Sequence, residues 1–131
     1  MLRCGLLGET LGHSYSPMIH HELGEYDYRL FEVSKEDLDA FLCSDRWDGL
    51  NVTIPYKREV MAFLDAVSPE AQAIGAVNCI RRAADGSLTG YNTDIVGLRA
   101  ALDELLGGEQ PSSALILGTG GASQAVQYAL A

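Results

Sequence analysis

Apolar and polar residues alternate with two different periods along this chain, and each change of period marks the border of an expected element. Residues 2–7, 26–33 and 49–53 are short apolar runs with the length and composition of strands. Polar starts and terminal glycines predict helices between and after them, at residues 16–24, 34–44, 55–64 and 68–75. This alternation predicts an α/β fold, with a mixed but mainly parallel sheet flanked by helices.

The pattern changes after residue 75. Residues 76–80 and 88–91 are expected to be strands joined by a hairpin turn over 84–87, so the sheet gains an antiparallel pair at this end. A helix then begins after Thr93, which is a plausible N-cap. Its buried face is expected to carry four apolar residues at helical spacing, Ile95, Leu98, Leu102 and Leu105.

The C-terminal part of the sequence has the order of a dinucleotide-binding unit. A linker over 107–113 precedes an apolar strand at 114–117, the loop GTGGAS at 118–123 and an apolar helix. In this context the glycines let the backbone approach a pyrophosphate, which binds at the helix N-terminus. Ser123 stands at the third glycine position. A dinucleotide-binding domain needs on the order of 100 further residues, so we expect this chain to be a fragment of a longer protein.

Composition and charge exclude several classes of function. With 47% hydrophobic and 21% charged residues, the sequence has the balance of a globular protein. The formal net charge of −9 argues against nucleic acid and against an anionic membrane surface as partners. No apolar run approaches the roughly 20 residues that span a bilayer, and no His/Cys cluster has the spacing of a metal site. Three cysteines in apolar contexts predict reduced, buried thiols and a cytoplasmic protein: Cys4, Cys43 and Cys79.

The stretch NVTIPYK at residues 51–57 has the pattern of a strand that runs into a helix. Alternation separates a polar face, with Asn51 and Thr53, from an apolar face that includes Ile54. The following proline is expected to open the helix and to leave Lys57 in its first turn, where the helix dipole repels a cation. This placement indicates an anionic partner for Lys57, and a solvated lysine at a strand–helix corner is the alternative.

Polar residues elsewhere are further candidates for chemistry. Ser16, followed by a proline, is a predicted N-cap, and Ser14 adds a second hydroxyl at a helix start, where a carboxylate or phosphate can bind. Asn78 is an amide within an apolar run, so it either braces a loop or faces a ligand. Asp94 falls in a first helical turn, where the helix dipole alone would favour an acid.

Five short motifs combine these residues in one order along the chain. They are GHSYSP at 12–17, NVTIPYK at 51–57, GAVN at 75–78, GYNTD at 90–94 and GTGGA at 118–122. Each motif alone is weak evidence, but together, in register over the whole chain, they resemble the shikimate dehydrogenase family, which includes quinate/shikimate relatives.

The resemblance implies reversible reduction of 3-dehydroshikimate to shikimate, with NADP as the cofactor, in the biosynthesis of aromatic compounds. Lys57 and Asp94 would flank the reacting oxygen as the catalytic pair, and the lysine would stabilise and protonate the alkoxide-like oxygen. Ser14 and Ser16 would hold the substrate carboxylate. The ring hydroxyls would be bound by Thr53, Asn78 and Asp94. The cofactor would contact Gly118, Gly120, Gly121 and Ala122. Asn51 is expected to brace the loop more than it binds a ligand.

The resemblance also divides the chain into a substrate-binding catalytic domain at residues 1–106 and, at 107–131, a linker with the start of an NADP-binding Rossmann domain. This fragment is expected to bind substrate without full activity. Two alternatives remain open, namely a module that binds substrate without turnover and a quinate/shikimate dehydrogenase of broader specificity. The apolar strand at 114–117 would be an exposed edge, so the chain is expected to form a homodimer or to aggregate through it.

Overall fold

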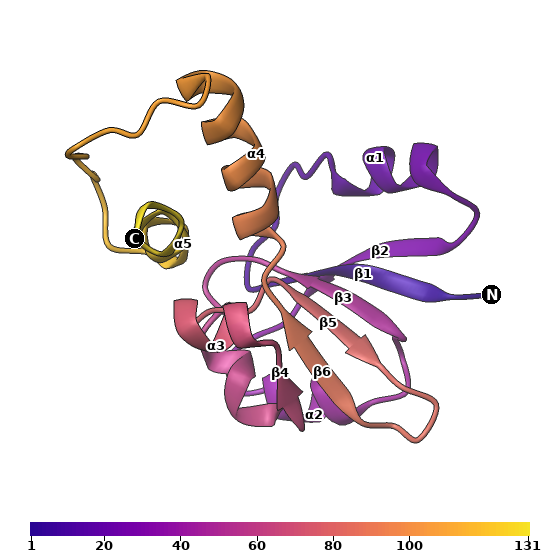
Figure 1. Ribbon diagram of the computed structural model, residues 1–131. Helices are drawn as coiled ribbons and strands as arrows, with labels where there is room; N and C mark the ends of the chain where they lie inside the picture. The colour runs from indigo at the N-terminus through magenta and orange to yellow at the C-terminus, as the bar shows by residue number, and fades with distance from the viewer.

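Six strands pair into one mixed sheet, with helices on both of its faces (Figure 1). The computed structural model describes all residues, 1–131. The strands are β1 (Arg3–Gly8), β2 (Asp27–Glu32), β3 (Gly49–Val52), β4 (Ala66–Val67), β5 (Cys79–Arg82) and β6 (Leu88–Tyr91). The α-helices are α1 (Ser16–Leu23), α2 (Leu38–Cys43), α3 (Pro69–Ile74), α4 (Asp94–Leu106) and α5 (Gly121–Leu130), and η1 (Glu59–Phe63) is a 3-10 helix.

The strand order is β2-β1-β3-β5-β6-β4. β1 pairs in parallel with β2 and β3, and β4 pairs in parallel with β6. β5 is antiparallel to both of its neighbours, β3 and β6. The predicted mixed, mainly parallel α/β fold is therefore confirmed. Because of these directions, β1, β3 and β6 all end at the same edge of the sheet, and β5 begins there.

The main core lies between one face of the sheet and the elements α2, η1 and α3. Alternate residues of the central strands point into it, including Leu7, Leu50, Val52 and Ile80. Two fully buried aromatic residues bring a polar atom into this core and satisfy it there. The Trp47 Nε1–H donates to the Phe41 carbonyl at 3.2 Å, and the Tyr56 hydroxyl donates to the Val33 carbonyl at 2.6 Å.

Arg82 anchors the end of β5 to this core. Its guanidinium carbon lies 4.1 Å from the centre of the Trp47 ring. The same guanidinium donates to the carbonyls of Leu42, Ser44 and Trp47 at 2.8 to 3.2 Å. One side chain therefore ties the loop after α2 to the sheet.

The helix predicted over residues 55–64 is wrong for its first half. β3 ends at Val52, and Ile54 is 78% exposed instead of lying on the apolar face of the strand. The peptide bond between Ile54 and Pro55 is cis, and turns follow it until η1 begins at Glu59. The chain turns here because the buried Tyr56 points into the core. Lys57 therefore lies in a turn before η1 and outside the helices, so the argument from a helix dipole does not apply to it.

Two predicted helix caps are also wrong. Tyr15 occupies the N-cap position of α1, and the Ser16 N–H instead donates to the Ser14 hydroxyl at 3.2 Å. Thr93 occupies the N-cap position of α4 without a capping hydrogen bond from its side chain. The Asn92 Oδ1 accepts from the Ile95 N–H at 3.3 Å and takes over that function. In both cases a nearby side chain accepts the hydrogen bond from a backbone N–H at the start of the helix. The side chain of the predicted cap is therefore free for other contacts.

The predictions for α3 are confirmed, whereas those for α4 need one change. The Ser68 hydroxyl caps α3 by accepting from the Ala71 N–H, and Gly75 ends the helix with φ at 74°. On α4, Leu105 is 80% exposed. The partly buried position in that turn is Leu106, one residue later.

The strand predicted at residues 114–117 does not form, so the expected β-loop-α order lacks its strand. The segment is extended but pairs with no other strand, and Leu115 and Leu117 are 85% and 87% exposed. A strand needs a neighbour for its backbone hydrogen bonds, and the sheet offers none here. Only α5 is ordered as expected, and it packs on α3 and α4 through a small cluster of Ile74, Ala76, Ile95 and Ala125.

All three cysteines are free, but the expectation that all are buried is wrong. Cys43 is exposed, and Cys4 and Cys79 are half-buried on the sheet. None of the helices combines the length and the apolar character needed to cross a membrane.

Candidate functional site

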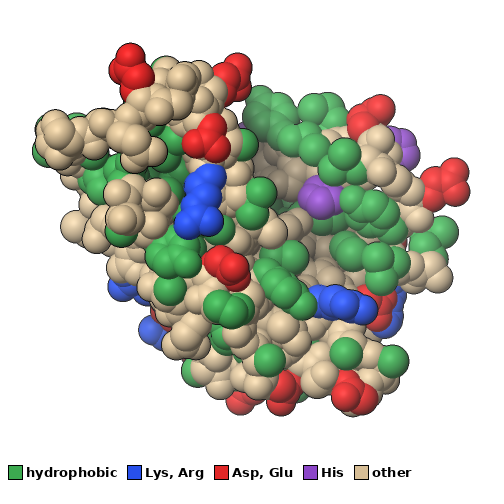
Figure 2. Space-filling model, viewed as in Figure 1, with side chains coloured by type: hydrophobic (Ala, Val, Ile, Leu, Met, Phe, Trp, Pro, Cys, Tyr) green, Lys and Arg blue, Asp and Glu red, His purple; other side chains and the backbone are tan.

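The predicted site residues gather at the sheet edge where β1, β3 and β6 end. Figure 2 shows the surface hollowed between α4 and α1, the two helices that begin near this edge. Ser14 and Ser16 follow β1, Thr53 follows β3, Asn78 precedes β5, and Asp94 follows β6. Parallel strands bring their carboxyl ends to one edge, so the topology collects residues that are far apart in the sequence.

Ser14, Ser16 and Thr53 line one cavity of about 590 Å³. The loop between β1 and α1 forms one wall, and the Leu11 N–H holds this loop by donating to the Glu32 carboxylate at 2.8 Å. The Thr53 N–H donates to the Leu7 carbonyl at 2.9 Å, which fixes the opposite wall to β1. Three residues that carry hydroxyl groups therefore line one space that is large enough for a small polar ligand.

Lys57 and Asp94 form an ion pair although they lie 37 residues apart in the sequence. The Lys57 Nζ donates to Asp94 Oδ2 at 2.7 Å, and the two side chains are 23% and 40% exposed. The Lys57 carbonyl accepts from the Val77 N–H at 2.7 Å, so the backbone of the lysine is also fixed. An ammonium held by a carboxylate is able to donate a proton to a ligand oxygen.

Asn78 braces the start of α4. Its Oδ1 accepts from the Thr93 N–H at 2.8 Å, and its Nδ2 donates to the Thr93 hydroxyl at 2.9 Å. The Asn78 carbonyl accepts from the Val52 N–H at 2.8 Å. Asn78 therefore links the end of β3, just before Thr53, to the residue that precedes Asp94. Of the two interpretations left open for this amide, these contacts support bracing, and contact with a ligand stays a prediction.

The structure thus brings the predicted residues together as two adjoining groups. One group lines the cavity: Ser14, Ser16 and Thr53. The other is linked by hydrogen bonds: Lys57 with Asp94, and Asn78 with Thr93. The groups meet at the end of β3, where a hydrogen bond from the Val52 N–H to the Asn78 carbonyl joins them.

The glycine loop lies beside the second group. A Cβ placed on Gly121 would be 3.6 Å from Lys57 Cδ, so the start of α5 approaches the stem of the lysine. A Cβ on Gly118 or Gly120 would meet no atom within 4 Å, and Gly118 has φ at 130°. The Ser123 hydroxyl donates to the Gly120 carbonyl at 2.9 Å. An open glycine loop at the start of a ten-residue helix fits a pyrophosphate, because the first N–H groups of a helix lack partners.

Two features of the site were not predicted from the sequence. The first is Asn92, which is only 6% exposed and donates to the Ala76 carbonyl at 3.0 Å while its Oδ1 accepts from the N–H of Ile95. An amide directly before an acidic helix start is the signal that could have revealed it. It holds the beginning of α4, and therefore Asp94, against the loop after α3.

The second is an aromatic network under α1. The Tyr28 hydroxyl donates to Asn51 Oδ1 at 2.8 Å, and the His20 ring stacks on the Tyr28 ring with centres 3.8 Å apart. Burial raises the pKa of Tyr28 to about 12, and the nearby Ser16 hydroxyl opposes this shift. Burial also lowers the pKa of His20, against a smaller opposite effect of Asn51. Through its amide oxygen, Asn51 therefore links β3 to β2.

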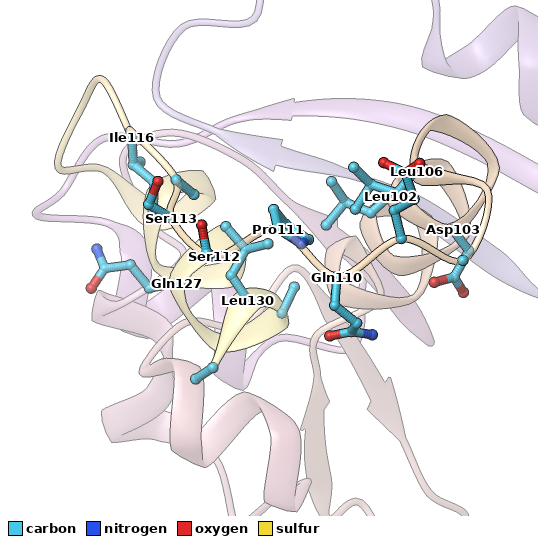
Figure 3. Close-up of a pocket in the computed structure, with 15 residues that line it drawn as sticks. Leu102, Asp103, Leu106, Gln110, Pro111, Ser112, Ser113, Ile116, Gln127 and Leu130 are labelled. Atoms are coloured by element: carbon cyan, nitrogen blue, oxygen red, sulfur yellow. The ribbon is translucent and has the colours of Figure 1, made fainter.

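A further cavity of about 450 Å³ lies away from these residues. It is enclosed by the end of α4, the linker and the end of α5, and Leu102, Leu106, Pro111 and Leu130 surround it (Figure 3). It contains none of the predicted catalytic or binding residues, and its titratable side chains are Asp103 and Glu109. The candidate site is therefore the sheet edge.

Comparisons with known proteins agree with this geometry. Residues 6–80 match the family model described as the shikimate dehydrogenase substrate binding domain. A shikimate dehydrogenase (NADP(+)) from Oleidesulfovibrio alaskensis is 48% identical, with 96% of this chain and 47% of that protein covered. The chain spans about half the length of the curated relatives it matches.

Two solved structures extend the comparison. Shikimate 5-dehydrogenase from Thermus thermophilus, in complex with NADP(H) and shikimate, has a TM-score of 0.87 and 42% identity over 99% of this chain and 52% of its own. Quinate dehydrogenase from Corynebacterium glutamicum, in complex with NAD, has a TM-score of 0.84 and 34% identity over 98% of this chain and 50% of its own.

Proposed function

This chain belongs to the shikimate dehydrogenase family, and we propose that it is the substrate-binding half of an NADP-dependent shikimate dehydrogenase. The observation that carries this proposal is the ion pair of Lys57 and Asp94, 2.7 Å apart, at the sheet edge that also holds Ser14, Ser16 and Thr53. The complete enzyme reduces 3-dehydroshikimate to shikimate and also catalyses the reverse reaction.

Lys57 and Asp94 are the proposed catalytic pair. NADPH, when bound, supplies the hydride that the carbonyl carbon accepts. As negative charge grows on the carbonyl oxygen, the Lys57 ammonium stabilises it by a charge-assisted hydrogen bond and transfers a proton to it. Asp94 holds the ammonium in place, so that little reorientation is needed during the reaction. In the reverse direction the lysine, once neutral, accepts the proton from the hydroxyl group.

The remaining predicted residues orient the substrate. Ser14 and Ser16 offer two hydroxyl donors in the cavity and are assigned to the carboxylate. Thr53 and Asn78, with Asp94, are assigned to the ring hydroxyls. The strongly acidic chain needs such local donors, because its overall field of −9 charges repels an anionic substrate.

We assign the glycine loop, with Gly118, Gly120, Gly121 and Ala122, to the cofactor. The open space over the loop and its position beside Lys57 support this assignment. We divide the chain accordingly, with residues 1–106 as the substrate domain and 107–131 as the linker and the start of a nucleotide domain. The clustering of the main core within the first segment supports this division. Three free cysteines support a cytoplasmic location.

A quinate/shikimate dehydrogenase of broader specificity is the second candidate. The 34% identity to a quinate dehydrogenase over nearly all of this chain favours it. Quinate differs from shikimate by a hydroxyl near the carboxylate, so the cavity around the two serines would decide between the substrates. The third possibility, a module that binds substrate without turnover, differs from the first in activity and shares its binding site.

Calorimetric titration of the chain with shikimate tests the proposal. The unaltered chain should bind saturably, and Lys57→Met should weaken binding about 10- to 100-fold, since a hydrogen bond to a charged group is lost. Lys35→Met is the matched control, because Lys35 forms an exposed ion pair with Glu59 away from the cavity. Absence of binding by the folded, unaltered chain would refute the proposal. Titration with quinate distinguishes the second candidate.

A further inference from the structure

Tyr28 reaches from the edge of the sheet toward the candidate site. It lies on β2, while Asn51 lies on β3, and β1 runs between these two strands. Neighbouring strands are about 4.8 Å apart, so the phenol must extend across β1 to reach the amide. It does so over Cys4, the residue that pairs with Tyr28 in the register of β1 and β2. The resulting hydrogen bond, from the Tyr28 hydroxyl to Asn51 Oδ1, is 2.8 Å long.

The phenol is held in this position by α1. The His20 ring lies parallel to the Tyr28 ring, with an angle of 9° between the planes and 3.8 Å between the centres. His20 is itself fixed, because its Nδ1 and the Tyr26 hydroxyl are 2.6 Å apart and form a hydrogen bond. The orientation of Tyr28 is therefore coupled to the helix that begins at Ser16.

Asn51 belongs to the same face of the chain as a predicted substrate residue. It precedes Thr53 by two positions, and residues at this spacing in an extended chain point to the same side. The Tyr28 hydrogen bond uses the amide oxygen of Asn51, and no hydrogen bond within the chain fixes the amide nitrogen. The His20 ring also lies near this amide, since Asn51 opposes the fall in the pKa of His20. The Ser16 hydroxyl lies near the Tyr28 phenol, since it opposes the rise in the pKa of Tyr28. Tyr28 therefore lies beside Ser16, which is assigned to the substrate carboxylate. It also bonds to Asn51, two positions before Thr53, which is assigned to a ring hydroxyl.

We infer that Tyr28 is a positioning residue for substrate binding, acting through the amide of Asn51. This inference rests on the proposed function. An asparagine amide can turn by half a rotation and exchange its oxygen and nitrogen. By donating to Oδ1, the Tyr28 hydroxyl selects the orientation that leaves the NH2 group free to donate to an oxygen of the substrate. Without that hydroxyl, both orientations become available and the donor is no longer fixed.

The chemistry of the phenol suits this role at all ordinary pH values. Burial raises its pKa to about 12, so the group remains a neutral O–H donor throughout the range in which the protein is handled. The stacked His20 adds no charge to the network at neutral pH, because burial lowers its pKa.

A double-mutant cycle measured by calorimetric titration with shikimate tests the inference. Tyr28→Phe should weaken binding about fivefold to tenfold, the effect of losing one oriented hydrogen bond. In an Asn51→Ala background the same change should alter the affinity by less than about twofold, because the group through which Tyr28 acts is gone. Tyr128→Phe is the matched control, since it removes a phenol hydroxyl on α5 that makes no hydrogen bond to Tyr28, His20 or Asn51. Its effect should also stay below about twofold.

Three outcomes would overturn the inference. Unchanged affinity of Tyr28→Phe would show that the hydroxyl is not needed. An equal loss in the Asn51→Ala background would show a general structural effect. In either case binding by the unaltered chain would leave the proposed function intact. If the unaltered chain, shown to be folded by circular dichroism, binds no shikimate, both the proposed function and this inference fail.

Discussion

Substitution of Asn92 should be among the most destabilising single changes at the candidate site. Asn92 lies between β6 and α4, is 6% exposed and makes two hydrogen bonds. Its Nδ2 donates to the carbonyl of Ala76, a residue with no exposed surface, and its Oδ1 accepts from the Ile95 N–H in the first turn of α4. In Asn92→Ala both partners lose their bonds in a place that water does not reach.

The expected loss follows from these two contacts. Removal of a helix cap costs about 1 kcal/mol, and a buried carbonyl left without a donor costs about 1 to 3 kcal/mol. Asn92→Ala should therefore lower the free energy of unfolding by about 2 to 4 kcal/mol. Asn92→Asp keeps the acceptor for Ile95 but places a carboxylate oxygen against the Ala76 carbonyl, so it should destabilise the chain at least as much as loss of the donor alone.

The free energy of unfolding of both variants is measured by urea unfolding, followed by circular dichroism. The midpoint urea concentration is converted to a free energy with one slope for all variants. Shikimate affinity should fall as well, because the start of α4 carries Asp94, the partner of Lys57. A loss below about 0.5 kcal/mol for Asn92→Ala, the range of ordinary surface substitutions, would refute the reasoning.

Three further predictions concern the core, pH and association. Arg82→Met should lower the free energy of unfolding by about 2 kcal/mol in urea, because a cation–π contact and carbonyl bonds are lost, whereas Arg81→Met, at an exposed neighbour, should change little. Hydrogen bonds from Arg3 lower the pKa of Asp48. The ionised carboxylate therefore stabilises the fold at pH values above the pKa of an ordinary carboxyl group, and this stabilisation is lost as the pH falls through the lowered pKa. Asp48→Asn should therefore reduce the melting temperature at pH 7 but not at pH 2. If the chain associates through residues 114–117, light scattering should find a dimer or larger species that Leu117→Lys converts to monomer. A monomeric unaltered chain would contradict this last prediction.

Local signals in the sequence determined those elements whose causes are local. The Ser68 cap and the Gly75 end of α3 follow from residues within one helical turn, and both were predicted. The start of α4 at Asp94 and the hairpin between β5 and β6 are of the same kind. The family motifs also predict which side chains belong to the site, because each motif is a short run of residues.

Contacts between distant residues explain the predictions that failed. The helix expected after Pro55 is interrupted because Tyr56 is buried and bonds to Val33, 23 residues earlier. An anionic partner was predicted for Lys57 because the lysine was expected in the first turn of a helix. The structure does contain such a partner, Asp94 at the start of α4, but Lys57 does not lie in a helix. The segment at 114–117 has the composition of a strand, but composition supplies no hydrogen-bonding neighbour.

The sequence by itself therefore determined the α/β class and the mainly parallel order, and it predicted which side chains belong to the site. Only the tertiary structure decided the arrangement, because β5 runs antiparallel between β3 and β6 and thereby places Asn78 against Thr93 at the same edge as Ser16 and Thr53. It also decided that Asn92 and Tyr28 support this edge. Their roles depend on burial and on partners across the sheet, and neither property is encoded in a short stretch of residues.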